Sequence, residues 1–105
     1  MNDHHPAQPP AEELELAAVL HALSDPIRLR IVRDLADHGA CHCGAFAVPV
    51  AKSTLSHHLR VLREAGLTLT EPAGTQRVVS LRRADLDARF PGLLDAVLGA
   101  APVPA

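Results

Sequence analysis

The sequence predicts a mainly α-helical domain that carries one small β-hairpin near its C-terminal end. Apolar residues recur at helical spacing along most of the 105 residues, and they alternate with polar residues only between Leu67 and Leu81. Aromatic residues make up only 2% of the chain, so the core must be built from Leu, Val, Ile and Ala, which favours helices. The length fits a single domain whose stability would gain from association with a second copy.

Two helices are expected in the first forty residues. The first covers residues 12–23, whose apolar side chains follow the i, i+3, i+4, i+7 pattern. Asp25 is suited to cap the second helix, Pro26 to occupy its first position and Gly39 to end it. Residues 1–11 and 101–105 are rich in Pro, Ala and polar groups, so we predict mobile tails on either side of a folded domain spanning 12–100.

Residues 40–51 follow no clear period. They contain the run Cys41-His42-Cys43-Gly44 and then a proline at position 49, which forbids a regular helix through that position. A short helix or an irregular segment is expected here.

The clearest helix covers residues 53–65. Ser53 is a good N-cap, and Gly66 is suited to end the helix. Three leucines at positions 55, 59 and 62 share one face and are assigned to the core, with His58 on the flank of that face as a structural histidine with a polar partner. The opposite face is polar and consists of Ser53, Ser56, His57 and Arg60.

Residues 67–81 are predicted to form the hairpin, because two alternating runs flank the turn-forming residues 71–75. A last helix over 84–98 has a wide apolar stripe, and Pro91-Gly92 should kink it or break it in two. The resulting order, α-α-α-α-β-β-α, is typical of a winged helix-turn-helix, in which one helix meets base edges and the hairpin grips the adjacent backbone of a nucleic acid.

The charge distribution agrees with a nucleic-acid partner better than the net charge of −2 does. From position 52 to position 83 there are six basic and two acidic residues, a net charge of +4, and the remainder carries −6. Such a block is the footprint of phosphate binding, although a solvated charged face would look the same. The six are Lys52, Arg60, Arg63, Arg77, Arg82 and Arg83.

Other classes of protein are not expected. No apolar run approaches the ~20 residues of a membrane span, and the first residues lack the pattern of a signal peptide, so we expect a cytoplasmic protein with reduced cysteines. The sequence offers no nucleophile–base pair, no glycine-rich phosphate loop and no paired carboxylates, so an enzyme is not expected.

Two stretches of the chain resemble a known family. Residues 23–31 (LSDPIRLRI) resemble the L-x-D-P-x-R-x-x-I signature that opens the second helix of ArsR/SmtB-type repressors, and residues 52–67 (KSTLSHHLRVLREAGL) are similar to their recognition helix. The resemblance runs from about Leu16 to Leu98. The chain departs from the family at Val48-Pro49-Val50-Ala51, where a regular supporting helix is usual, so that helix should be short or displaced.

The resemblance implies a homodimer that represses transcription by binding a DNA operator with dyad symmetry. In this family the first and last helices form the dimer interface, and the wide apolar stripe of the last helix fits that role. The interface residues predicted in this way are Leu16, Leu20, Leu86, Phe90, Leu93, Leu94 and Val97.

The DNA-contacting residues are predicted from charge and from the helical wheel. Lys52 and Arg60 are candidates for phosphate contacts, with Arg77 on the wing. Near the start of the recognition helix, side chains that could donate to phosphates or base edges are Ser53, Thr54, Ser56 and His57. For Arg63, Arg82 and Arg83 the sequence leaves open whether they attract DNA at long range or are merely solvated.

A DNA-binding repressor of this kind requires no cofactor, but the sequence allows a regulatory metal or metalloid ion. Cys41-His42-Cys43 resembles the Cys-x-Cys of thiolate-based sensors in the family, and thiolates bind soft ions such as As(III), Cd(II), Pb(II) and Zn(II). In a regular helix, residues two apart point away from each other, so Cys41 and Cys43 could converge only in an irregular or terminal turn. The alternative is that Cys43 is a small buried residue and Cys41 an inert neighbour.

Two other functions remain open at this point. The first is a metal-binding or metal-trafficking protein that uses the Cys41-His42-Cys43 cluster, against which the polar helix face and the basic block argue. The second is a winged-helix module that binds protein, for which the acidic net charge is the only support.

Overall fold

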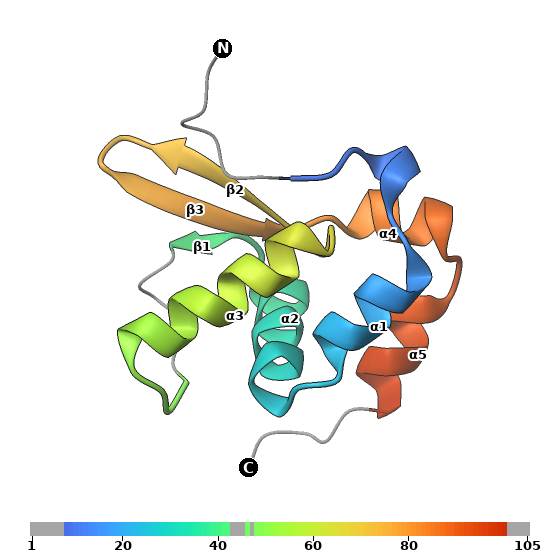
Figure 1. Cartoon of the computed structure of the whole chain (residues 1–105), viewed down its shortest axis with the longest axis horizontal. Coiled ribbons are helices and arrows are strands. Elements are labelled where there is room, and N and C mark those ends of the chain that lie inside the picture. The colour runs from blue at the N-terminus through green and yellow to red at the C-terminus, as the bar shows by residue number, and fades with distance from the viewer. Residues whose placement is uncertain (1–7, 43–45, 47, 101–105) are drawn as a thin grey trace.

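The computed structural model describes residues 8–42, 46 and 48–100. In Figure 1 a β-hairpin projects to one side of a helical body, and α1, α4 and α5 lie on the other side. The elements in chain order are the 3-10 helix η1 (Ala11–Glu13), α1 (Leu16–Leu23), α2 (Pro26–His38), β1 (Cys41–His42), α3 (Lys52–Glu64), β2 (Thr68–Ala73), β3 (Gln76–Leu81), α4 (Arg83–Arg89) and α5 (Leu93–Ala100).

The first helix is shorter than the sequence predicts. The 3-10 helix ends at Glu13, the backbone is extended at Leu14 and Glu15, and α1 begins only at Leu16. Leu14 is 1% exposed, so the extended stretch places this side chain in the core. Burying this leucine contributes more to the folding free energy than an additional turn of exposed helix would, and this explains why the helix does not begin earlier.

The N-terminal segment packs on the domain from residue 8 onward, which corrects the predicted tail over 1–11 at its last four residues. The side chain of Gln8 accepts a hydrogen bond from the amide of Thr70 on β2. Arg82 donates from Nη1 to the carbonyl oxygen of Pro9 at 2.6 Å. Residues 1–7 and 101–105 lie outside the described part of the chain.

The ends of α2 lie where the sequence predicts them. Asp25 is the N-cap, and its Oδ2 accepts from the amides of Ile27 at 2.8 Å and Arg28 at 3.1 Å. Pro26 is the first helical residue, and Gly39 ends the helix with φ +83°.

The segment after α2 contains a short strand. Cys41 and His42 form β1, which pairs antiparallel with β3, so the sheet has the order β1-β3-β2. Among the described residues between Gly39 and Ala51 there is no helix, because Pro49 supplies no amide and holds the preceding residue extended. A hairpin forms as the sequence predicts, and it pairs from Thr68 opposite Leu81 to Ala73 opposite Gln76. Its turn is shorter than the predicted 71–75, because β2 continues through Ala73 and leaves only Gly74 and Thr75 between the strands.

Helix α3 begins one residue earlier than predicted. The N-cap is Ala51, which makes no side-chain cap, so the prediction of Ser53 as N-cap is wrong. The extended backbone of Ala51 leads directly into the helix, and its carbonyl accepts from the amide of Leu55. At the other end Gly66, with φ +88°, forms a Schellman motif in which Leu67 donates to the carbonyl of Leu62.

The core corrects part of the predicted dimer interface. Leu86 on α4 and Leu94 on α5 are each 1% exposed within the single chain, so they belong to its own core and are not available to a partner. The turn at Pro91-Gly92 separates α4 from α5 as predicted, and this break turns both leucines inward. The predicted interface residues that retain exposed surface are Leu16, Leu20, Phe90, Leu93 and Val97.

Candidate nucleic-acid interface

The two faces of α3 divide as the sequence predicts. Leu59 and Leu62 are buried, Leu55 is half-buried against the core, and His58 is 8% exposed. The opposite face is open to solvent and carries no core contact. Its exposed residues are Lys52, Ser53, Thr54, Ser56, His57 and Arg60, all of which were predicted to contact DNA.

His57 and Arg60 lie together on this open face. Arg60 Nη2 is 3.4 Å from His57 Nδ1, and both side chains are exposed. A guanidinium can only donate, so Nδ1 accepts in this contact and the proton of a neutral His57 ring is on Nε2. The outward edge of the imidazole therefore presents a donor, which suits a phosphate oxygen or a base acceptor.

A groove of about 750 Å³ separates α3 from the hairpin. Its floor is apolar, formed by Phe46, Val48, Val50 and the inner leucines of α3. Its walls are cationic and polar. They are lined by Lys52, Ser53, Ser56, His57, Arg60 and Arg63 from α3, and by Thr70 and Arg77 from the hairpin.

Arg63 lines this groove, and the sequence left its role open. Its side chain is partly buried, and its Nε has no hydrogen-bond partner within the described part of the chain. It lies three residues after Arg60, so the two share the helix face that looks toward the hairpin. That spacing was the available signal that Arg63 belongs with the groove.

The first turn of α3 adds backbone donors to the same surface. The first amides of any helix lack intrahelical acceptors, and no side chain caps this end of α3. Ser53 and Thr54 lie in this turn with exposed side chains. Amides and hydroxyls thus face solvent where the helix dipole favours an anion.

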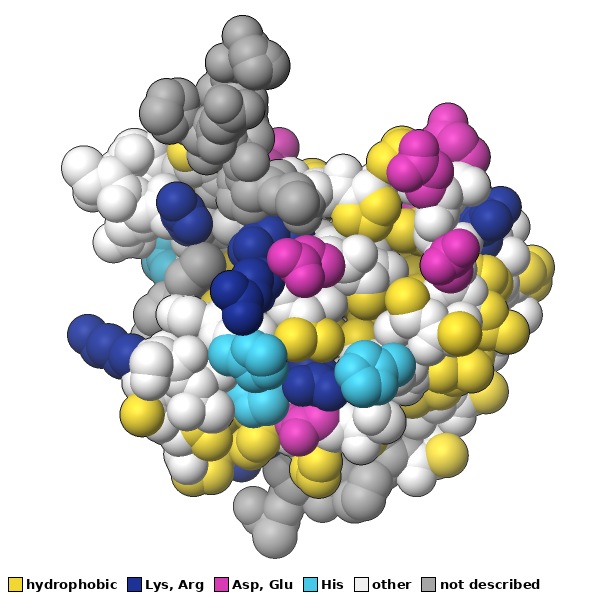
Figure 2. Space-filling model, in the orientation of Figure 1, with side chains coloured by type: hydrophobic (Ala, Val, Ile, Leu, Met, Phe, Trp, Pro, Cys, Tyr) yellow, Lys and Arg dark blue, Asp and Glu magenta, His cyan; other side chains and the backbone are white. Residues whose placement is uncertain are grey.

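The last two basic residues between positions 52 and 83 form ion pairs with carboxylates. Arg82 donates from Nε to Asp85 at 3.1 Å. Arg83 pairs with Asp95 and Asp87, and the hydrogen bond that it donates to Asp95 is the main cause that raises the pKa of this guanidinium. The positive charge left without such carboxylate pairs therefore gathers around the groove, and Figure 2 shows Lys, Arg and His side chains clustered over α3 and the hairpin.

The face formed by α1 and α5 has the opposite character. Leu16 and Leu20 are 46% and 45% exposed, one turn apart on α1. Figure 2 shows a broad hydrophobic area on this side of the molecule, away from the basic cluster.

The structure describes only one cysteine of the predicted thiol pair. Cys41 is partly buried in β1, paired with Val79, whereas Cys43 lies outside the described residues. Within the described ranges, no three His, Cys, Asp or Glu side chains gather as metal ligands would. A closed metal centre needs about four ligands, more than the described residues bring together. No helix in that part of the chain is long and apolar enough to span a bilayer.

The chain is similar to known regulators over most of its length. A family model described as a helix-turn-helix domain matches residues 23–71. The HTH-type transcriptional regulator YceK of Bacillus subtilis is 39% identical over 82 residues, which cover 75% of this chain and 82% of that protein. The arsenical resistance operon repressor of Staphylococcus xylosus is 34% identical over 74 residues, which cover 70% of this chain and 71% of the repressor.

A solved structure shares the fold. The crystal structure of the transcriptional repressor BigR from Xylella fastidiosa superposes with a TM-score of 0.65 and 28% identity, covering 85% of this chain and 88% of that one. The winged helix-turn-helix predicted from the order of elements is thereby confirmed. Sequence and fold together place the chain in the ArsR/SmtB family of winged helix-turn-helix transcriptional regulators.

Proposed function

We propose that this regulator represses transcription as a homodimer that inserts α3 into the major groove of a dyad-symmetric operator. The observation that carries the proposal is the uninterrupted polar face of α3, on which six neighbouring side chains are exposed and none serves the core. In this arrangement His57 and the hydroxyls of the first turn meet base edges, while Lys52 and Arg60 contact phosphates.

The groove between α3 and the hairpin supports a second set of backbone contacts. Arg77 lies on β3 across from Arg63, and both line the same cationic walls. A DNA strand that follows α3 would pass the hairpin with its phosphates toward these guanidiniums. Arg77 is therefore proposed as the wing contact, and Arg63 is added to the predicted set.

The apolar face of α1 and α5 supports association of two copies. Two large leucines almost half exposed on one short helix are unusual for the surface of a monomer. A two-fold axis through this face would place two recognition helices on the same side of the dimer, as an operator of two half-sites requires. The interface side chains proposed are Leu16, Leu20, Phe90, Leu93 and Val97.

Binding is tested by fluorescence anisotropy with duplex DNA from upstream of the gene, against a shuffled duplex of equal length. Each of the variants His57→Ala and Arg60→Ala should weaken specific binding by about tenfold while the melting temperature stays unchanged, since both side chains are exposed. Glu64→Ala, an exposed change near the end of the same helix, is the matched control and should not weaken binding.

Two different failures can be told apart in this experiment. If the wild-type protein binds both duplexes equally, sequence-specific repression is wrong. If it prefers the upstream duplex and both alanine variants bind as well as the wild type, the assignment of this face of α3 is wrong.

We further propose that a soft metal or metalloid ion releases the operator through the thiolates of Cys41 and Cys43. The staphylococcal relative is named as the repressor of an arsenical resistance operon, which supports an ion of this class. The objection from helical geometry does not apply at Cys41, because this residue lies in a strand. A metal-trafficking role and a protein-binding module receive no such support from the relatives.

A further inference from the structure

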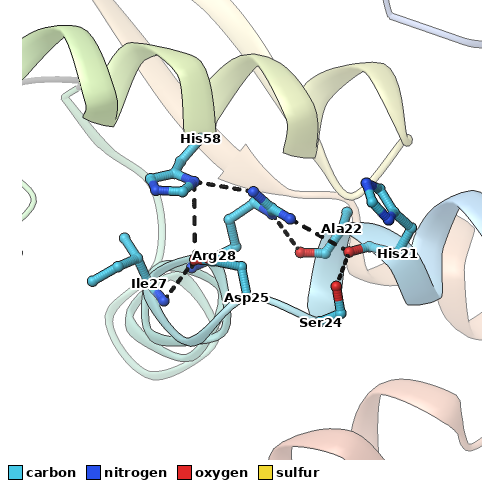
Figure 3. Close-up of polar contacts among 7 residues, drawn as sticks. All are labelled: His21, Ala22, Ser24, Asp25, Ile27, Arg28 and His58. Carbon is cyan, nitrogen blue, oxygen red and sulfur yellow. Dashed lines mark hydrogen bonds and ion pairs between the residues drawn. The ribbon is translucent and has the colours of Figure 1, made fainter.

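Arg28 lies at the junction of three helices although it carries a charge. The residue is 8% exposed, and its guanidinium makes three contacts with groups outside its own helix. Its Nε donates to the carbonyl of Ala22 at 2.7 Å, and its Nη2 donates to the carbonyl of His21 at 3.4 Å, both at the end of α1. Its Nη1 lies 3.1 Å from Nδ1 of His58 on α3, as Figure 3 shows.

These contacts fix the protonation state of His58 in the observed arrangement. A guanidinium has five donors and no acceptor, and it stays protonated in proteins. Nδ1 of His58 must therefore accept the hydrogen bond from Arg28. It follows that the ring is neutral, with its proton on Nε2.

Asp25 joins the same cluster from the start of α2. Its Oδ2 accepts from two backbone amides of the first turn and lies 3.9 Å from Nδ1 of His58. The cluster thus consists of one cation, one carboxylate and one neutral imidazole. Figure 3 shows it between the end of α1, the start of α2 and the middle of α3. Its burial at a helix junction restricts how α3 can rotate against the other two helices.

The buried contact is adjacent to the surface proposed to bind DNA. The ring centroids of His58 and His57 are 5.8 Å apart, and His57 contacts Arg60. Because these residues belong to one rigid helix, a rotation of α3 that breaks the bond between Arg28 and His58 also moves His57 and Arg60 relative to the DNA.

We propose that Arg28 and His58 are positioning residues for operator binding: their hydrogen bond locks the rotation of the recognition helix against the end of α1. The inference rests on the proposed function of α3, and it adds that residues which never touch DNA determine the affinity. It also connects α1, which carries the proposed dimer face, to α3 through a single side chain.

Four substitutions test the lock with the intact protein and the upstream duplex. Arg28→Lys keeps the charge, but its single ammonium nitrogen cannot reach the three acceptors that the guanidinium contacts from three separate nitrogens, so operator affinity should fall about tenfold. Arg30→Lys is the matched control, since Arg30 is exposed two residues along the same helix, and it should bind as the wild type does. His58→Asn keeps an acceptor at the position of Nδ1 and should bind within about threefold of the wild type, whereas His58→Leu should lose as much as Arg28→Lys.

Comparison of the two His58 variants separates positioning from simple loss of stability. His58→Asn should recover the operator affinity that His58→Leu loses, because only Asn offers an acceptor to Arg28. The melting temperature of each variant is measured alongside its affinity. If a folded His58→Leu variant binds the operator as tightly as the wild type, the positioning role is wrong.

The tautomer provides a measurement that does not depend on any variant or on DNA. Nitrogen-15 NMR of the free wild-type protein at pH 7.5 should show His58 neutral with its proton on Nε2, and a proton on Nδ1 would overturn the proposal. If the wild-type protein shows no preference for the upstream duplex, the proposed function is wrong. Wild-type protein that binds it, together with an Arg28→Lys variant that is folded and binds equally well, refutes the positioning role instead.

Discussion

Leu14 fills the space directly beside Gly66, at the point where α3 ends and the hairpin begins. A Cβ atom placed on Gly66 would overlap the Cδ2 methyl group of Leu14. Gly66 also has φ +88°, a conformation that side chains with a Cβ rarely adopt. The N-terminal segment is therefore packed against the hinge between the recognition helix and the wing.

Gly66→Ala should destabilise the protein by about 2–4 kcal/mol, because backbone strain and overlap with Leu14 add together. Gly39→Ala is the matched control, since Gly39 has φ +83° and nothing within 4 Å of the position of a Cβ. Gly39→Ala should cost only the backbone term, about 1–2 kcal/mol. Urea denaturation at one fixed protein concentration measures both, and equal losses would show that Leu14 does not constrain this site.

Leu16→Glu combined with Leu20→Glu should produce a folded monomer. Both leucines are almost half exposed, so the charges interfere with a partner more than with the core of the chain itself. Sedimentation velocity should show the wild type as a dimer and the double variant as a monomer at the same concentration. A double variant that stays dimeric would exclude α1 from the interface.

Leu86→Ala serves as the contrasting variant for the interface. This side chain is 1% exposed within the single chain, and its truncation should cost about 2–5 kcal/mol of stability through the cavity that it leaves. The folded fraction should still be dimeric, because the substitution does not alter the exposed face.

The features that the sequence predicted correctly depend on neighbours within a few residues. Asp25 as a cap, Gly39 and Gly66 as helix ends, and the division of α3 into buried and exposed faces all follow from local geometry. The polar partner expected for His58 was also found, although its identity as Arg28 required the fold, because 30 positions separate the two residues.

The features that the sequence missed depend on distant parts of the chain. Cys41 forms a strand because the edge of β3 offers Val79 as a partner, and no periodicity in residues 40–51 reveals that edge. Leu14 leaves the first helix because the core accepts it beside Gly66. Leu86 and Leu94 looked like an interface because a helical stripe does not tell whether the covering surface is a partner or the same chain.

Arg77→Gln should weaken binding to specific and non-specific DNA alike and reduce the slope of log Kd against log salt by about 1. Arg77 is exposed on β3 and faces the groove, so its loss removes a phosphate contact without affecting the core. Arg82→Gln is the control, because Arg82 is held by Asp85 and by the carbonyl of Pro9. It should lower the melting temperature and leave the salt slope unchanged, and a slope that Arg77→Gln does not change would remove the wing from the DNA contact.

Cys41→Ser and Cys43→Ser should abolish release of the operator by soft ions while leaving operator affinity in their absence unchanged. Thiolates, unlike hydroxyls, bind As(III), Cd(II), Pb(II) and Zn(II) strongly, and Cys41 lies on β1, next to the strand that carries Arg77. An ion bound at Cys41 would therefore strain the sheet that forms the wing. The measurement is anisotropy of the operator complex titrated with each ion, with Mg(II) as a hard-ion control. If both serine variants release the operator at the same ion concentration as the wild type, the thiolates are excluded as the sensing ligands.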